Sequence, residues 1–438
     1  MNNNIKRLSE AFQGDADNRT TTINLVASEN ITSECVRKTL SHPCYDYYHF
    51  SAASEKIQDD YWLFYDNFFI KDVRSQIKLF SKDLLKSPII DPRPKGGQCA
   101  QLATLLGIAS RDDIVFYVRE EDGGHYGLSD IAKIAGILLI PIIFNQADCT
   151  IDIERTLKKI KDVSLSTNTN RCKGLIIGQS FTLRKEKLAE LCSEIKESFP
   201  NMVITFDASH TLGLIMGNEY PQPLLSGVDI LHANTHKTFP GPQKGIIVFS
   251  ETLDIKVVQN LSDKVVPTLQ SNSGTSEILS LAVAFQEMQL YSVNYAKDIC
   301  ENAKLLANEL YNKGFEVVGK HFGFTETHQV LLKGFSKAEA IENASRLISS
   351  GIKVNPAIIP FTNNSWGIRI GTSSITRRGL SPNHIRDISN LFSRIINDKV
   401  DPTLVNKKVK ELMTNYPIRK LKYCLPSNIE RALLNWNK

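Results

Sequence analysis

The chain has 438 residues, of which 42% are hydrophobic and 23% are charged, with 52 basic residues against 47 acidic ones. This length exceeds what one core usually organises, so two domains are expected, and the composition is typical of a soluble, globular protein rather than a disordered one. The net charge of +5 is spread along the chain without a long basic block, which argues against a nucleic-acid-binding arm.

The amino-terminal residues 1–20 are expected to form an arm, and Met1–Arg7 lacks the apolar stretch of a secretory signal. From about residue 90 to 250, apolar β-rich runs alternate with amphipathic stretches, which indicates a mostly parallel sheet covered by helices. The predicted strands are Ile114–Val118, Leu138–Ile140, Gly174–Gly178, Val203–Phe206, Asp229–Leu231 and Gly245–Phe249. Helices are expected between them, for example over Ile151–Asp162 and Lys185–Ser198.

A long helix is predicted over Thr275–Lys313, and the domain boundary is expected inside it. The expected division is a large α/β domain over residues 21–285 and a smaller α+β domain over residues 286–438. The strands predicted in the smaller domain are Phe315–Val318, Gln329–Leu332 and Gly367–Ile370, with helices around Lys337–Ser349 and Asn383–Asn397.

Two further features argue against a membrane or metal protein. The longest apolar run, Ile134–Phe144, is too short to span a bilayer and contains Pro141. The eight cysteines are scattered singly without a C-x-x-C pair, so reduced thiols and no metal site are expected. We therefore expect a cytoplasmic protein with neither membrane nor nucleic acid as a partner.

The stretch with most chemical information is an apolar strand, Val203–Phe206, that ends in Asp207 and His210. Ligand sites in α/β sheets form at the carboxyl ends of strands. The strand predicted at Asp229–Leu231 is followed by Thr235, His236 and Lys237. If the two strands are near neighbours, Lys237 lies beside the end of the Asp207 strand.

An acid and a lysine in this arrangement suit pyridoxal phosphate, because a carboxylate keeps the pyridine nitrogen protonated while an amine holds the aldehyde as a Schiff base. Each residue alone has a simpler explanation: Asp207 as a helix N-cap, His236 as a core histidine and Lys237 as a surface charge. Arg369 suits a substrate carboxylate, since a guanidinium pairs with it through two parallel hydrogen bonds, although a strand-end salt bridge is the simpler explanation.

Several motifs occur together in one order, and with them the chain resembles serine hydroxymethyltransferases and their relatives among fold-type I pyridoxal-phosphate enzymes. The motifs are Asn24–Asn30, Asp122–His125, Asp207–His210, Thr235–Thr238, and Gly367–Thr372 followed by Ile375–Gly379. The resemblance implies an α/β fold with a mostly parallel, seven-stranded type of sheet, helices on both faces and a smaller α+β carboxyl-terminal domain. It also implies a homodimer with shared active sites.

The resemblance also assigns roles to residues of this chain. Lys237, Asp207 and His125 are the expected catalytic residues, as Schiff-base lysine, ring-nitrogen acid and ring-stacking histidine. Further cofactor contacts are expected from His210, Gly96, Gly97, Gln98, Ser180, Thr235, His236, Gln270 and Ser271. Arg369, Ser28 and Tyr48 are expected to bind the substrate, although Tyr45 or Tyr47 could supply the same phenol.

The departures from the family pattern fall in identifiable parts of the site, some of which bind folate in the family. No glutamate aligns in the tyrosine segment Cys44–Ser51, and Tyr126–Ser129 lacks the second histidine of the loop after His125. The phosphate turn is Lys95–Gln98 instead of Ser-Gly-Ser, where backbone N–H groups at a helix start still suit a phosphate. The glycine-rich turn that reaches the neighbouring subunit's cofactor is replaced by Pro267–Gly274. The chain keeps the motifs for the cofactor and the substrate carboxylate but lacks the folate-binding residues. In this respect it resembles threonine transaldolases, which form β-hydroxy amino acids without folate.

The expected reaction makes or breaks the Cα–Cβ bond of a β-hydroxy-α-amino acid such as threonine or serine through a glycine quinonoid, with an amino acid and an aldehyde as substrates. A folate-independent transaldolase is favoured. A tetrahydrofolate-dependent hydroxymethyltransferase and a noncatalytic paralogue are the alternatives, and a scaffold protein has no need for Lys237, Asp207 and Arg369 together.

Overall fold

The computed structural model describes residues 3–47, 68–167, 169–362 and 365–437. The chain divides into two compact units, and the division falls within the longest helix, α10 (Thr275–Asn312). The large unit comprises residues 32–297 and 423–438, and the small unit comprises residues 1–31 and 298–422.

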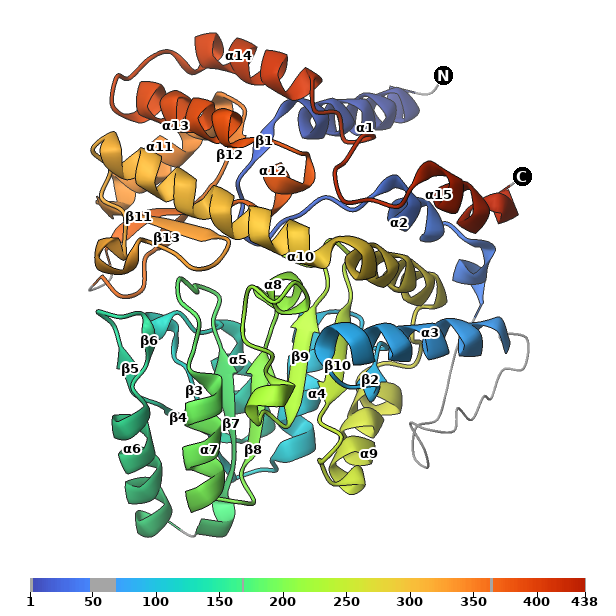
Figure 1. Cartoon of the computed structure of the whole chain (residues 1–438), viewed down its shortest axis with the longest axis vertical. Helices are drawn as coiled ribbons and strands as arrows, with labels where there is room; N and C mark the ends of the chain where they lie inside the picture. Colours follow the sequence, from blue (N-terminus) through green and yellow to red (C-terminus); the bar gives the residue numbers. More distant parts are fainter. Residues whose placement is uncertain (1–2, 48–67, 168, 363–364, 438) are drawn as a thin grey trace. The chain divides into compact units, whose positions relative to one another are not determined.

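A seven-stranded sheet forms the centre of the large unit, with the strand order β2-β10-β9-β8-β7-β3-β4 (Figure 1). Its strands are β2 (Ile90–Asp91), β3 (Ile114–Tyr117), β4 (Leu138–Pro141), β7 (Cys172–Gly178), β8 (Val203–Asp207), β9 (Ile230–Asn234) and β10 (Gly245–Phe249). Only β10 runs antiparallel to its two neighbours. The strands are mostly apolar because helices cover both faces of the sheet.

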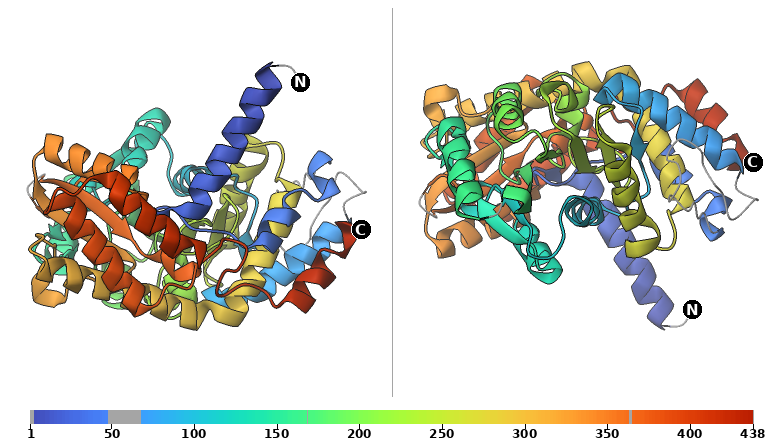
Figure 2. Two further views of the ribbon diagram at one scale, coloured as in Figure 1. Left: turned by 90° about the horizontal axis from the view of Figure 1, so that it is seen from above. Right: turned by 90° about the horizontal axis from the view of Figure 1, so that it is seen from below.

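Helices α4 (Gly97–Ile108), α5 (Gly127–Ala135) and α9 (Ile255–Asp263) cover one face of this sheet, and α7 (Leu188–Ser198) lies on the other (Figures 1 and 2). The alanines of α4 pack with Ile230 of β9 and Ile247 of β10 in one buried cluster. Since alanine has a short side chain, α4 can lie close to the strands that precede the predicted lysine loop.

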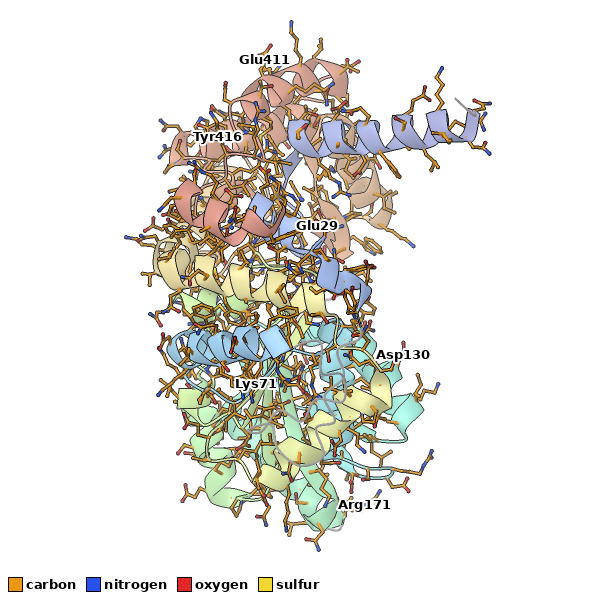
Figure 3. All side chains as sticks on the ribbon, turned by 90° about the vertical axis from the view of Figure 1, so that its right-hand side faces the viewer. Glu29, Lys71, Asp130, Arg171, Glu411 and Tyr416 are labelled. Atoms are coloured by element: carbon orange, nitrogen blue, oxygen red, sulfur yellow. The ribbon has the colours of Figure 1, made fainter. Side chains whose placement is uncertain are left out.

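The remaining elements of the large unit lie around this core. They are α2 (Glu34–Thr39), α3 (Phe68–Leu85), the hairpin of β5 (Phe144–Asn145) and β6 (Thr150–Ile151), α6 (Ile153–Ser166), α8 (Leu212–Met216) and α15 (Ser427–Leu433). Charged residues such as Lys71 on α3 and Asp130 on α5 lie exposed at the surface of this unit (Figure 3).

The small unit contains the antiparallel three-stranded sheet β11-β14-β13 and the two-stranded parallel sheet β1-β12. Its strands are β1 (Ile23–Asn24), β11 (Gln329–Phe335), β12 (Ile352–Lys353), β13 (Asn355–Ile358) and β14 (Trp366–Gly371). Its helices are α1 (Asn3–Thr21), α11 (Lys337–Ser349), α12 (Ser373–Arg377), α13 (Pro382–Ile396), α14 (Pro402–Thr414) and the second part of α10. A core of buried residues from α10, α11, α13, α14 and these strands holds the unit together.

The six predicted strands of the large unit and the predicted α/β fold class are confirmed. The strand predicted at Phe315–Val318 is wrong, since only an isolated bridge between Val317 and Leu332 forms there. Glycines with positive φ at 314 and 319 turn the chain on either side of this segment, so it is too short to pair as a strand. None of the helices in the described part of the chain combines the length and apolar character that a bilayer span requires.

Candidate active site

The predicted acid and lysine lie at the carboxyl ends of two neighbouring strands. Asp207 is the last residue of β8, which pairs in parallel with β9, and Asp207 stands opposite His232 in the register. Lys237 follows three residues after the end of β9, and its charge contributes to lowering the pKa of Asp207. The prediction that the two strands are neighbours is confirmed, and the two side chains are within electrostatic reach of each other.

The carboxylate of Asp207 is held in a tight, largely buried environment. Its Oδ1 accepts a hydrogen bond from the Ser209 N–H at 2.9 Å, and its Oδ2 lies 3.8 Å from Nε2 of His232. Gly178 of β7 lies opposite on the other side, where a Cβ would come within 2.7 Å of the Asp207 Cβ. Burial alone would raise the pKa of Asp207, but the His232 ring, Ser209 and Lys237 together lower it below its ordinary value. The acid is therefore an anion at neutral pH.

Lys237 is in direct contact with a predicted cofactor residue. Its Nζ lies 3.0 Å from Nε2 of His210, which is buried. The hydroxyl of Thr238 donates to the His210 carbonyl at 2.9 Å, and the hydroxyl of Thr235 donates to the carbonyl of Pro242 at 2.6 Å. These bonds close the loop after β9, so Lys237 is presented by a fixed backbone, and the Thr235 hydroxyl is used within that loop.

His125, the predicted ring-stacking histidine, is within electrostatic reach of Asp207 and Lys237. Its pKa is lowered by burial, while Asp207 acts to raise it and Lys237 acts to lower it, which places all three side chains within one electrostatic environment. Nδ1 of His125 accepts a hydrogen bond from the Gly127 N–H at 3.3 Å. The lowered pKa makes the ring neutral at pH 7, so the proton resides on Nε2.

The loop that carries His125 is anchored by a buried carboxylate. Asp122 accepts hydrogen bonds from Arg119 Nε at 2.6 Å and from Gln146 Nε2 at 3.1 Å. The next residue, Gly123, has φ of 87°, a backbone conformation that favours glycine. Its carbonyl accepts the N–H of Ser180 at 2.7 Å, which holds this predicted cofactor residue beside the His125 loop.

The glycine turn forms the start of helix α4. Gly96 occupies the N-cap position and no side chain caps the helix there, while the space beside Gly96 is open. Gly97 lies so close to Asn234 of β9 that a Cβ would come within 2.8 Å of the Asn234 Cβ. Uncapped N–H groups and the helix dipole make this end of α4 suitable for an anion such as phosphate.

Of the predicted cofactor residues near this turn, Gln98 and Ser271 are exposed, whereas Gln270 is hydrogen-bonded to the backbone. Gln98 is exposed on the first turn of α4, with its Nε2 near Gly127. Gln270 forms hydrogen bonds to the backbone just before this turn. Its Oε1 accepts from the Lys95 N–H at 3.0 Å, and its Nε2 donates to the Arg93 carbonyl at 2.8 Å. The amide of Gln270 is thus bound to the backbone of its own chain, and Ser271 is exposed.

His236 contributes a second neutral imidazole next to Lys237. Burial and the charge of Lys237 lower the pKa of His236 to about 4. The ring is consequently uncharged at pH 7, and its Nδ1 is buried without a hydrogen-bond partner in the described residues.

The predicted substrate residues Arg369 and Ser28 lie in the small unit. Arg369 is part of β14 and stands opposite Asn355 of β13, and burial lowers its pKa to about 10, so it remains a cation at pH 7. Ser28 follows Ala27, which lies against Gly371 at the end of β14. The structure therefore brings Ser28 near the carboxyl end of β14, the strand that contains Arg369. Tyr48 lies outside the described residues, and the alternatives Tyr45 and Tyr47 are exposed.

Sequence reasoning missed three polar residues next to this site: His232, Asn234 and Lys244. His232 and Asn234 are buried in β9 immediately before the lysine loop. Lys244 is buried beyond the loop, where its Nζ donates to the carbonyls of Arg93 at 3.2 Å and Ser273 at 2.7 Å. The available signal was a histidine inside an otherwise apolar strand between two recognised motifs.

A protein-family model described as serine hydroxymethyltransferase matches residues 1–392. The chain belongs to the serine hydroxymethyltransferase family. Serine hydroxymethyltransferase from Methanosphaera stadtmanae is 30% identical over 403 residues, which cover 90% of each chain. The enzyme of that name from Pyrococcus abyssi is 31% identical over 408 residues, which cover 91% of this chain and 92% of the relative.

A solved structure is also similar to this family member. L-threonine transaldolase from Pseudomonas fluorescens, crystallised in its internal aldimine state, superposes with a TM-score of 0.90 at 31% identity. The match covers 98% of this chain and 97% of the transaldolase. The serine hydroxymethyltransferase-like chain is therefore a pyridoxal-phosphate-dependent transferase or aldolase of fold type I, and the predicted family, fold and cofactor are confirmed.

The residues present fit this cofactor. Among the described residues, the buried polar atoms without a hydrogen-bond partner include Oδ1 of Asn234 and Nδ1 of His236, beside Lys237 in the chain, and Nε2 of Gln179, which follows β7. Unsatisfied buried groups are costly, and in native proteins they commonly mark a ligand or water position. Together with the uncapped start of α4, the ionised Asp207 and the lysine, they provide groups for a phosphate, a pyridine nitrogen and an aldehyde.

Proposed function

We propose that this protein is a threonine transaldolase that works without folate: it cleaves the Cα–Cβ bond of a β-hydroxy-α-amino acid and joins the remaining glycine unit to a second aldehyde. The observation that carries the proposal is the loop after His125. Tyr126–Ser129 contains no second histidine that could contact a folate. Gly127 and Leu128 of this stretch are buried, and Leu128 packs with Leu105 and Val115 in the core. The similarity to the transaldolase over nearly the whole chain supports the same assignment.

Pyridoxal phosphate, when bound, supplies a conjugated ring that accepts the electron pair released at Cα when the Cα–Cβ bond breaks. Lys237 would hold its aldehyde end, and Asp207 its pyridine nitrogen. The lowered pKa of Asp207 keeps the carboxylate negative, which stabilises a proton on that nitrogen. The uncapped start of α4 at Gly96 and Gly97 would bind the phosphate.

Histidines near Lys237 would affect the protonation and surroundings of its amine. His210 is in contact with Nζ at 3.0 Å, so it can accept or return a proton there. Neutral His236, with its pKa of about 4, adds no positive charge beside the amine. Neutral His125 would lie against the cofactor ring, where it excludes water and can donate a hydrogen bond through Nε2.

Arg369 and Ser28 would bind the substrate carboxylate. A guanidinium fork forms two parallel hydrogen bonds to a carboxylate, and the pKa of about 10 keeps it charged throughout the physiological range. Fixing the carboxylate orients the Cα substituents, and this orientation decides which bond of the amino acid is broken.

The second candidate function is a tetrahydrofolate-dependent serine hydroxymethyltransferase. It is favoured by the archaeal relatives named serine hydroxymethyltransferase, which are 30% and 31% identical to this chain. The two candidates share the cofactor and carboxylate groups and differ in the second substrate.

One experiment separates them. The purified protein is incubated with threonine and a second aldehyde, and with serine, each with and without tetrahydrofolate. Release of acetaldehyde together with a new β-hydroxy amino acid in the absence of folate supports the transaldolase. Conversion of serine to glycine only in the presence of folate refutes it in favour of the second candidate. Loss of the product in Lys237→Ala but not in Lys158→Ala, an exposed lysine of α6, ties the reaction to the site. A wild-type chain that binds no cofactor would instead indicate a noncatalytic paralogue.

A further inference from the structure

His232 is a buried polar residue to which the proposed mechanism gives no role. It lies in the middle of β9, its side chain is 0% exposed, and neither ring nitrogen has a hydrogen-bond partner among the described residues. The cost of leaving a buried polar group unpaired is about 1–3 kcal/mol. A histidine in an apolar strand at such a cost calls for an explanation in terms of a neighbouring group.

The ring of His232 lies close to Asp207, the proposed ring-nitrogen acid. In the register of β8 and β9, His232 stands opposite Asp207, and its Nε2 lies 3.8 Å from Oδ2 of Asp207. Directly opposed residues of a parallel pair project to the same face of the sheet. Helix α4 covers the residues on either side of His232, since Ile230 packs with the alanines of α4 and Asn234 lies against Gly97.

The protonation of the ring determines what it can do there. Burial lowers the pKa of His232, with Asp207 acting in the opposite direction and His125 acting to lower it further. A neutral imidazole has one N–H donor and one acceptor nitrogen. Oδ1 of Asp207 already accepts from the Ser209 N–H, so Oδ2 is the acceptor that faces the ring.

We propose that His232 is a positioning residue for Asp207, donating a hydrogen bond from Nε2 to Oδ2 so that the carboxylate stays ionised and aligned with the pyridine nitrogen of the cofactor. The present 3.8 Å separation must close to about 3 Å, a side-chain adjustment of under about 1 Å. The inference rests on the proposed assignment of Asp207 to the ring nitrogen. It extends that assignment, because it makes β9 a second support for the acid beside the backbone of Ser209.

The alternative is that His232 only fills space under α4. An apolar residue of similar size would then support the fold equally well and leave cofactor binding unchanged. The two explanations therefore differ in what replacement of the ring does to the cofactor rather than to the fold.

The test compares four full-length proteins: wild type, His232→Leu, His232→Gln and His232→Asn. The amide nitrogen of glutamine can reach the position of Nε2, whereas that of asparagine reaches the position of Nδ1. Each protein is stripped of cofactor and titrated with pyridoxal phosphate, and the absorbance of the bound cofactor is followed against pH. We expect affinity to fall by about tenfold or more in the leucine and asparagine variants, with a shifted pH midpoint, and to remain within about threefold of wild type in the glutamine variant.

A matched control uses Ile230→Val, two residues away on the same face of β9. It perturbs the packing under α4 without changing a polar group, so cofactor affinity and the pH midpoint should stay at wild-type values. If His232→Leu does not fold, the comparison of the glutamine and asparagine variants still decides the question. Equal affinity in those two variants, or wild-type affinity in the leucine variant, overturns the proposal.

The variant Asp207→Asn tests separately whether Asp207 binds the pyridine nitrogen and whether His232 positions Asp207. If Asp207→Asn leaves the affinity and spectrum unchanged, the assignment of the acid is wrong. If Asp207→Asn weakens binding and His232→Leu does not, only the role of His232 fails. If His232 acts through the acid, the effects of the two substitutions are not additive, and His232→Leu changes little in a chain that already carries Asp207→Asn.

Discussion

Glu186 gives a strong stability prediction because its carboxyl group is buried and forms no salt bridge within the part of the chain that the structure describes. It lies between β7 and α7 with 3% of its surface exposed. Its Oε2 accepts the N–H of Ile151 at 3.0 Å, and its Oε1 has no hydrogen-bond partner among the described residues. Burial raises the pKa of Glu186 to about 8, so the folded protein carries this carboxyl group protonated at neutral pH.

The sign of the pH dependence follows from this shift. Between the ordinary pKa of 4.5 and about 8, the folded state binds a proton that the unfolded state does not, so the free energy of unfolding falls as the pH rises. The loss is about 1.4 kcal/mol per pH unit, or about 3 kcal/mol by pH 7. Glu186→Gln retains an oxygen for the Ile151 N–H and needs no proton. We therefore expect this variant to exceed wild type in stability by about 3 kcal/mol at pH 7 and to match it near pH 4.5.

The assay is guanidinium denaturation of the cofactor-saturated protein at several values between about pH 5 and about pH 8. The control is Glu194→Gln, which removes an exposed glutamate from α7 and should track wild type at every pH. A stability difference between Glu186→Gln and wild type that does not change with pH would refute the reasoning, as would a variant less stable than wild type at pH 8.

Three further predictions concern buried groups and close contacts. Burial lowers the pKa of Lys244 to about 7, so the free energy of unfolding of the wild type should rise by about 2 kcal/mol between about pH 7.5 and 9. In denaturation experiments Lys244→Met should lack this rise. An equal pH dependence of stability in the two proteins would contradict the prediction. Asp91→Asn leaves the buried guanidinium of Arg93 without its carboxylate. The free energy of unfolding, measured by the same assay, should fall by about 3 kcal/mol or more. A decrease of under about 1 kcal/mol would count against the prediction. Gly371→Ala places a Cβ against the backbone of Ala27, so the thermal midpoint should fall clearly, and an unchanged midpoint would show that the segment can move aside.

The sequence was sufficient to predict how Asp207 and Lys237 come together. Asp207 ends one largely apolar strand and Lys237 follows the next, and the carboxyl ends of neighbouring parallel strands meet at one edge of the sheet. His125 could be connected with them only through the resemblance to a family, because its loop follows a strand, β3, that is not adjacent to β8. The irregular segment Phe315–Val318 has the composition of a strand, and only its flanking turns and single bridge show why it does not form one.

His232 was beyond the reach of the sequence for a different reason. Its importance depends on the register between β8 and β9, and a shift of one residue would direct it to the opposite face. The backbone hydrogen bonds of Gln270 were equally hidden, since its partners Arg93 and Lys95 are far from it in the chain. The predicted assignment of Gln270 and Ser271 to the cofactor stays a prediction.

Gly178, Asp207 and His232 form a row across three adjacent strands, one residue from each. Inserting or deleting a single amino acid within β7, β8 or β9 would rotate one member of this row out of line and leave the other two without it. Efforts to redesign the enzyme should consequently keep the length of these strands constant. Insertions and deletions belong in the segments that lead into the amino-terminal ends of the strands, where an added residue need not disturb the alignment.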